Sequence, residues 1–190
     1  MNISRYLIII LIIISPIKSF AQWEQVFDRE TRCINSNNGI LYAGSTFGLY
    51  VSTNNGNTWK VNNQIGAVVL NILFFGDEMV VNWSSRFAKS TDGGQTWTNV
   101  MLPTTIRSLT GDGITFYAGL FEDGVYKSTN GGSNFTSIGF FNATVHSIVK
   151  HENKLFAGTS YSGLYSSTNE GATWSHQFDS ISVGRIAVHG

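Results

Sequence analysis

A nine-residue segment recurs four times along the chain, and this repetition constrains the fold more than any other feature of the sequence. The segments span residues 51–59, 89–97, 127–135 and 166–174, and the second reads Lys-Ser-Thr-Asp-Gly-Gly-Gln-Thr-Trp. The aromatic residues that close the segments lie 38, 38 and 39 residues apart. A period this regular indicates one structural unit used repeatedly.

Each segment is predicted to form the turn of a β-hairpin, because strand-forming residues precede and follow it. An Asn or Asp in the turn can accept hydrogen bonds from backbone N–H groups, and a glycine two residues later can adopt a positive φ. The closing aromatic residue is expected to fold back over the hairpin and be buried. These residues are Asn54, Gly56, Trp59, Asp92, Gly94, Trp97, Asn130, Gly132, Phe135, Asn169, Gly171 and Trp174.

The segment from Ser90 to Trp97 resembles the Asp-box, or bacterial neuraminidase repeat, written S-x-D-x-G-x-T-W. This motif marks β-propellers of sialidases, of some secreted glycoside hydrolases, of sortilin-type receptors and of the photosystem II stability and assembly factor family. The chain is most similar to the last of these. Three copies carry Asn in place of Asp, and the third also has Asn134 for Thr and Phe135 for Trp. The resemblance therefore implies a structural turn, remote from the ligand face, and the three Asn residues argue against a role for this position as a charge.

The repeat length predicts an all-β fold. Four antiparallel strands in about 38 residues match a propeller blade, so the chain is expected to hold four complete blades and a partial one. Residues 23–26 align with the strand that follows each turn, and residues 183–188 align with the first strand of a repeat. Two alternatives follow, namely a fragment of a larger propeller or a ring that is left open.

The first 21 residues are predicted to be a secretory signal peptide. Arg5 precedes the apolar run from Tyr6 to Ile14, and the segment ends Ser-Phe-Ala at Ala21. Nine apolar residues are too few to span a bilayer, although a retained anchor is the alternative. Residues 22–190 would then be an exported propeller domain without stable membrane insertion. The net charge of zero and 13% charged residues give no reason to expect a nucleic acid partner.

The starts of the first strands and the loops after the second strands are expected to share one face of the propeller. A column of cationic and polar residues there, surrounded by loop aromatics, suits an anionic, peptidic or carbohydrate ligand on a protein scaffold. The alternative is that the cations are solvated and the aromatics pack between blades. The column is Arg32, Asn71, Arg107, His146 and Arg185, and the loops supply Phe47, Trp83, Arg86, Phe121 and Tyr161.

The single cysteine, Cys33, is expected to be a small buried strand residue. In the alignment of repeats its counterparts are Ile72, Ser108, Ser147 and Ile186.

Catalytic patterns are missing from the sequence. A sialidase-like hydrolase needs an arginine cluster, a tyrosine activated by Glu and an acid/base Asp. The acids nearest the proposed face, Glu122 and Asp123, lie in an expected turn beside Gly124. The four histidines show no metal-ligand spacing, and no cofactor motif is present. The sequence therefore predicts a non-catalytic exported propeller that binds a protein or peptide, and the alternative is a truncated glycoside hydrolase.

Overall fold

The computed structural model describes residues 30–139, 142–178 and 182–187. These residues form sixteen strands in four antiparallel sheets of four, which we call blades 1 to 4. The signal peptide predicted for residues 1–21 and the strand predicted for residues 23–26 lie outside the described residues. No helix in the described part of the chain is long and apolar enough to cross a membrane.

Blade 1 contains β1 (Thr31–Asn37), β2 (Ile40–Ser45), β3 (Gly48–Ser52) and β4 (Lys60–Val61). Blade 2 contains β5 (Val69–Phe75), β6 (Glu78–Trp83), β7 (Arg86–Ser90) and β8 (Thr98–Met101). Blade 3 contains β9 (Ile106–Gly111), β10 (Phe116–Leu120), β11 (Val125–Ser128) and β12 (Thr136–Gly139). Blade 4 contains β13 (Val145–His151), β14 (Lys154–Thr159), β15 (Gly163–Ser167) and β16 (Ser175–Phe178). The predicted all-β fold with four strands per repeat is confirmed.

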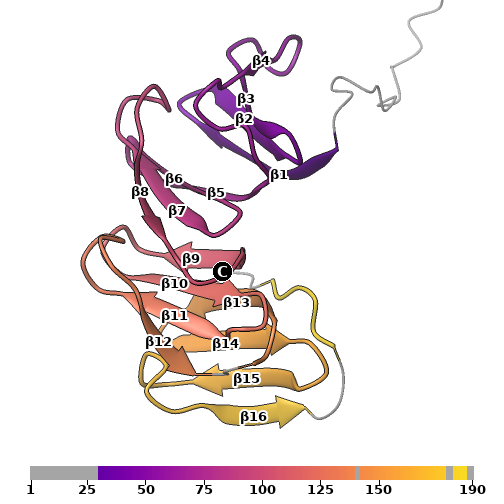
Figure 1. Cartoon of the computed structure of the whole chain (residues 1–190), viewed down its shortest axis with the longest axis vertical. Helices are drawn as coiled ribbons and strands as arrows, with labels where there is room; N and C mark the ends of the chain where they lie inside the picture. The colour runs from indigo at the N-terminus through magenta and orange to yellow at the C-terminus, as the bar shows by residue number, and fades with distance from the viewer. Residues whose placement is uncertain (1–29, 140–141, 179–181, 188–190) are drawn as a thin grey trace, which may run out of the picture.

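Each blade pairs its strands in chain order, so the first and last strands form its two edges. Figure 1 shows the blades following one another in an arc, with the first strands on the inner side and the last strands on the outer side. The first strands of successive blades contact one another, since β1 lies against β5, β5 against β9 and β9 against β13. The inner edge of the arc is therefore lined by equivalent residues from each repeat.

The hydrophobic core lies between the blades. Three buried clusters each combine residues of two successive blades, for example Tyr42 and Leu49 of blade 1 with Ile72 and Met79 of blade 2. Burial depends on the neighbouring blade, because Ile34 on the outer face of blade 1 is 62% exposed while the equivalent Ile72 is 4% exposed. The repeats thus stabilise one another by stacking.

The four nine-residue segments form the same turn. In each, a buried serine at the end of the third strand accepts a hydrogen bond from the glycine N–H four residues later, for example Gly94 N to Ser90 Oγ at 2.7 Å. The side-chain Oδ1 of the Asn or Asp accepts from a backbone N–H four residues later, as Asp92 does from Thr96 at 2.9 Å. The four glycines have φ between 82° and 89°. The corresponding serines and glycines are Ser52 and Gly56, Ser128 and Gly132, and Ser167 and Gly171.

The closing aromatic residues are less buried than expected. Trp59, Trp97, Phe135 and Trp174 are all half-buried. The expected burial is therefore only partial, although Trp97, Phe135 and Trp174 pack against the core clusters. Two of the indole N–H groups donate hydrogen bonds, Trp97 Nε1 to Gly94 O at 3.1 Å and Trp174 Nε1 to Ile138 O at 3.2 Å.

Residues 182–187 begin a further unit beside blade 4. A Cβ built on Gly158 would lie 2.7 Å from Val183 Cγ1, just as one on Gly119 would lie 2.7 Å from Val145 Cγ1. The Ile186 N–H donates to Ser147 Oγ at 3.1 Å, as the Ile148 N–H donates to Ser108 Oγ at 3.0 Å. The segment therefore takes beside blade 4 the position that β13 takes beside blade 3.

Candidate functional site

The inner-edge residues singled out from the sequence fall at two adjacent positions of the repeat, not one. The strand ladders pair Cys33, Asn71, Ser108 and Ser147 with the equivalent residues of the second strands, namely Gly44, Asn82, Gly119 and Gly158. Arg32, Arg107 and His146 precede this position, and their counterpart in β5 is Leu70. Because Val183 is equivalent to Val145, Arg185 corresponds to Ser147.

The predicted repeat alignment is therefore wrong by one residue at two places. Asn71 and Arg185, and not Ile72 and Ile186, are the counterparts of Cys33. The segment between the closing aromatic and the first strand is one residue longer after Trp59 and Phe135 than after Trp97 and Trp174. A slip of one residue moves a side chain to the other face of a strand, so residue counting alone could not assign these faces.

The structure nevertheless brings the predicted cations together around two neighbouring cavities. A cavity of about 310 Å³ is lined by Asn71, Arg107, His146 and Arg185, together with backbone of β9, β13 and the 182–187 segment. A second cavity of about 390 Å³ is lined by Arg32, Asn71 and Arg185. Asn71 and Arg185 line both, and we call the pair the axial cavities. No Asp or Glu is among the described residues that line either one.

The polar side chains of the axial cavities differ in whether they already have a hydrogen-bond or ion-pair partner. Asn71 donates to Asn82 Oδ1 at 2.6 Å, and His146 Nε2 lies 2.7 Å from Ser160 Oγ. Arg32 forms an ion pair with Glu30 at 2.8 Å. Arg107 and Arg185 are exposed and form no ion pair with an acid in the described part of the chain. These two guanidinium groups are thus available for a carboxylate or phosphate.

None of the predicted loop aromatics is among the described residues that line an axial cavity. Phe121 contacts one of the predicted cations, because the Arg107 guanidinium carbon lies 5.0 Å from its ring centroid, a cation–π distance. Tyr161 is 86% exposed and Phe47 is 59% exposed. Trp83 instead packs on the core with its ring 6.0 Å from that of Trp97.

Arg86 also lies away from the axial cavities. Its Nη1 donates to Asn99 Oδ1 of β8 at 2.9 Å, which directs the guanidinium toward the outer strand of its own blade. Neither Arg86 nor Trp83 lines an axial cavity.

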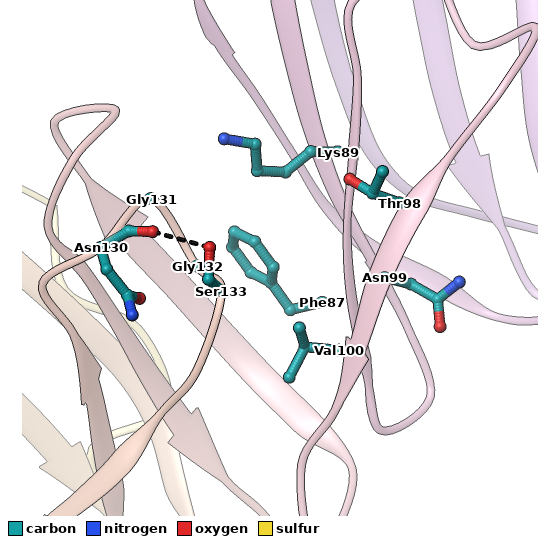
Figure 2. A pocket seen from close by; sticks show the side chains of 9 residues that line it. All are labelled: Phe87, Lys89, Thr98, Asn99, Val100, Asn130, Gly131, Gly132 and Ser133. Carbon is teal, nitrogen blue, oxygen red and sulfur yellow. Dashed lines mark hydrogen bonds between the residues drawn. The ribbon is translucent and has the colours of Figure 1, made fainter.

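A cavity that the sequence did not predict lies between β7 and β8 of blade 2 and the nine-residue turn of blade 3. It has a volume of about 420 Å³. Figure 2 shows Lys89, Thr98 and Asn99 on one side, the turn from Asn130 to Ser133 on the other, and Phe87 between them. We call it the outer cavity.

The outer cavity opens beside a glycine of the third segment. Between blades 3 and 4 the equivalent gap is bridged by Lys127 Nζ and Glu170 Oε2 at 2.8 Å. In blade 3 the counterpart of Glu170 is Gly131, which has no side chain. The second segment also has a glycine at this position, Gly93, so no signal in the sequence could have located this cavity.

The structure contains a tyrosine and carboxylate pair that the sequence analysis did not recognise. The Tyr126 hydroxyl donates to Asp123 Oδ2 at 2.9 Å. Burial, followed by the hydrogen bond and the charge of Asp123, raises the pKa of Tyr126. Neither Tyr126 nor Asp123 is among the described residues that line an axial cavity, so the pair lies apart from the predicted cations. The described residues also contain no group of three or more His, Cys, Asp or Glu side chains placed to hold a metal ion.

No protein-family model matches the chain, and no curated protein matches it. Among solved structures it is similar to YCF48 from Cyanidioschyzon merolae, at 20% identity and a TM-score of 0.63 over 87% of this chain and 61% of that one. It is also similar to the extracellular domain of the putative one component system BT4673 from B. thetaiotaomicron, at 18% identity and a TM-score of 0.68 over 82% and 23% of the two chains. A third similar structure is the GH74 xyloglucanase from Xanthomonas campestris, at 14% identity and a TM-score of 0.64 over 82% and 32%.

These likenesses establish the fold. The neighbours are β-propellers, and the four sheets of this chain are propeller blades. The chain spans about a quarter of the length of the GH74 enzyme and BT4673 structures that match it first.

Proposed function

We propose that the protein is an exported, non-catalytic propeller that acts as a binding or assembly scaffold and holds an acidic segment of a protein or peptide partner at its axial cavities. The observation that carries this proposal is the convergence of Arg107, His146 and Arg185 on one cavity without an acid among the described lining residues. Like charges gathered in this way repel one another, and an anionic ligand relieves the repulsion. Phe121 beside Arg107 adds an apolar contact at the rim.

The similar structures support this reading by analogy. YCF48 and the extracellular domain of BT4673 share the blade architecture, and the latter is extracellular by its description. The apolar N-terminal segment of this chain favours export in the same way. Fold alone does not determine function, so the proposal depends on the axial cations.

A truncated glycoside hydrolase is the second candidate, favoured by the likeness to GH74 enzymes. Glycoside hydrolysis needs two carboxyl groups on either side of the scissile bond. The axial cavities provide none among their described lining residues, and Asp123 already accepts the Tyr126 hydroxyl. The scaffold reading therefore fits the described residues better.

The test is the affinity of the chain for a fluorescein-labelled hexaglutamate peptide, measured by fluorescence anisotropy at salt concentrations from about 25 to 300 mM. Binding should weaken as salt rises, because exposed charges are screened. The Arg107→Ala, Arg185→Ala double variant should bind at least about tenfold more weakly, as expected for the loss of charge-assisted hydrogen bonds. Lys60→Ala is the matched control, since Lys60 is an exposed cation on β4.

Unchanged affinity in the double variant would rule out the axial cavities as the binding site. Turnover of sialosides or xyloglucan by the chain, lost on substitution of Glu122 or Asp123, would instead favour the hydrolase.

A further inference from the structure

The Tyr117 hydroxyl is buried without a hydrogen-bond partner. The side chain is 0% exposed, and its oxygen has no partner among the described residues. A buried hydroxyl without a partner keeps the full cost of leaving water, and such groups in native proteins commonly face a bound water or ligand. The group therefore needs a polar occupant nearby.

A cavity lies beside this tyrosine, between blades 3 and 4. It has a volume of about 320 Å³ and is lined by Tyr117, Lys150, Asn153, Lys154, Thr168 and Glu170. Burial, followed by the charges of Glu170 and Asp112, raises the pKa of Tyr117 to about 12. The hydroxyl of this lining residue is therefore a neutral donor.

Comparison with the equivalent interface, between blades 1 and 2, shows why this cavity exists. Between blades 1 and 2 the residue equivalent to Tyr117 is Tyr42, and Phe74 covers it with ring centroids 5.1 Å apart. The strand ladders place Lys150 at the position of Phe74, since Phe74 pairs with Met79 and Lys150 pairs with the equivalent Leu155. Replacement of an aromatic ring by a lysine makes the space beside the tyrosine polar, although the ring itself stays buried.

The charges around the cavity leave one positive charge uncompensated. Lys127 pairs with Glu170 at 2.8 Å, and Lys150 pairs with Asp112 at 3.4 Å. Lys154 lines the cavity, is exposed, and forms no ion pair with an acid in the described ranges. The occupant that fits a hydroxyl donor and one free ammonium is therefore a monoanion with oxygen acceptors.

We propose that this cavity binds a single carboxylate group, which accepts hydrogen bonds from the Tyr117 hydroxyl and the Lys154 ammonium. The carboxylate could come from a small organic acid or from the C-terminus of a peptide, and the two sources share this chemistry. The site is separate from the axial cavities, because Lys150 lies near the end of β13 whereas His146 lies near its start. It does not depend on the proposed function.

The first experiment is an NMR titration of the chain with sodium acetate, at constant ionic strength, and with acetamide as the neutral isostere. Acetate should shift resonances of residues 150–155 and 168–170 saturably, while acetamide should not. Tyr117→Phe and Lys154→Gln should each weaken acetate binding by about tenfold or more, the usual effect of losing a hydrogen bond to a charged group. Lys60→Gln, which removes an exposed lysine from blade 1, should leave acetate binding unchanged.

Thermal unfolding separates a ligand site from a cavity that holds water only. Without acetate, Tyr117→Phe should unfold at the same or a higher temperature, because it removes a hydroxyl without a partner. With acetate, the wild-type unfolding temperature should rise and that of Tyr117→Phe should not. Equal responses to acetate and acetamide, or equal acetate affinity in wild type and both variants, would overturn the proposal.

Triglycine with a free or an amidated C-terminus identifies the source of the carboxylate. Binding of the free acid alone indicates a peptide C-terminus, and binding of acetate without either peptide indicates a small acid.

Discussion

The ring of Phe87 in blade 2 packs directly over Gly132 in blade 3. In the other blades the indole of the same segment lies close to the glycine at this position, since a Cβ built on Gly94 would lie 3.2 Å from Trp97 and one on Gly171 would lie 3.3 Å from Trp174. The third segment ends in Phe135, which is smaller than tryptophan, and Phe87 stands where blade 1 has the smaller Leu49. The two substitutions compensate each other across the interface, with the rings of Phe87 and Phe135 5.1 Å apart.

This compensation predicts strong coupling between the two positions. Phe135→Trp alone should destabilise the fold by about 1–3 kcal/mol, because it overpacks a filled interface. Phe87→Leu alone should also destabilise, because it leaves a cavity. The Phe87→Leu, Phe135→Trp double variant carries the residue pair found at the interface of blades 1 and 2. Its free energy of unfolding should be at least about 1 kcal/mol higher than the value expected from adding the two single losses. Urea denaturation measures the cycle, and additive effects would contradict the interpretation.

Trp97→Ala should lower the free energy of unfolding by about 2–3 kcal/mol. Removal of a fully buried aromatic costs about 3–5 kcal/mol, and this indole is only half-buried. The variant also loses the hydrogen bond from Nε1 to Gly94 O and the edge contact with Trp83. Equilibrium denaturation gives the value, and Thr98→Ala, at the exposed neighbouring residue, should change it by less than about 0.5 kcal/mol. A loss below about 1 kcal/mol for Trp97→Ala would show that the indole is not part of the core.

Asp92 should make the stability of the chain depend on pH in the acid range. Hydrogen bonds from the Thr96 side chain and N–H, and then from Ser90, lower the pKa of Asp92 from 3.8 to about 2. Because the folded pKa lies below the unfolded one, the stabilisation is present above about pH 4 and is lost as the pH falls through about 2. Asp92→Asn should reduce this dependence in urea denaturation between pH 2 and 5.

The reciprocal variant tests the same reasoning in blade 4. Asn169 Oδ1 accepts from Thr173 N at 2.9 Å, so Asn169→Asp should add an acid-dependent contribution of the same sign. An unchanged pH profile in both variants would contradict the assigned hydrogen bonds.

Cys33 should be unreactive in the folded protein. Burial raises the pKa of its thiol to about 11, so the thiolate is scarce at pH 8. The chain has one cysteine, and a thiol reagent such as a disulfide dye therefore reports on this site alone. Modification should be slow at pH 8 and rapid after unfolding in urea. Complete modification of the folded protein within seconds would show that the thiol is accessible.

The sequence by itself determined the repeat unit. A glycine that needs a positive φ, a short acceptor side chain and an aromatic at constant spacing encode a local turn, which forms from residues within ten positions of one another. Hence the four turns, the strands beside them and the all-β class could be predicted. The cationic residues of the inner edge could also be identified, because the repeat length places them near the same end of each blade.

The tertiary structure alone decided which of these residues share a site. Whether Arg185 aligns with Arg107 or with Ser108 depends on the length of a connecting loop, and a difference of one residue reverses the face of the strand. The burial of Ile72 and the exposure of Ile34 are likewise set by whether another blade covers them. The cavities beside Tyr117 and Phe87 form between residues that are far apart in the sequence, since Tyr117 and Lys150 are separated by 33 positions and Phe87 and Gly131 by 44. Such contacts join separate repeats, so no local pattern in the sequence records them.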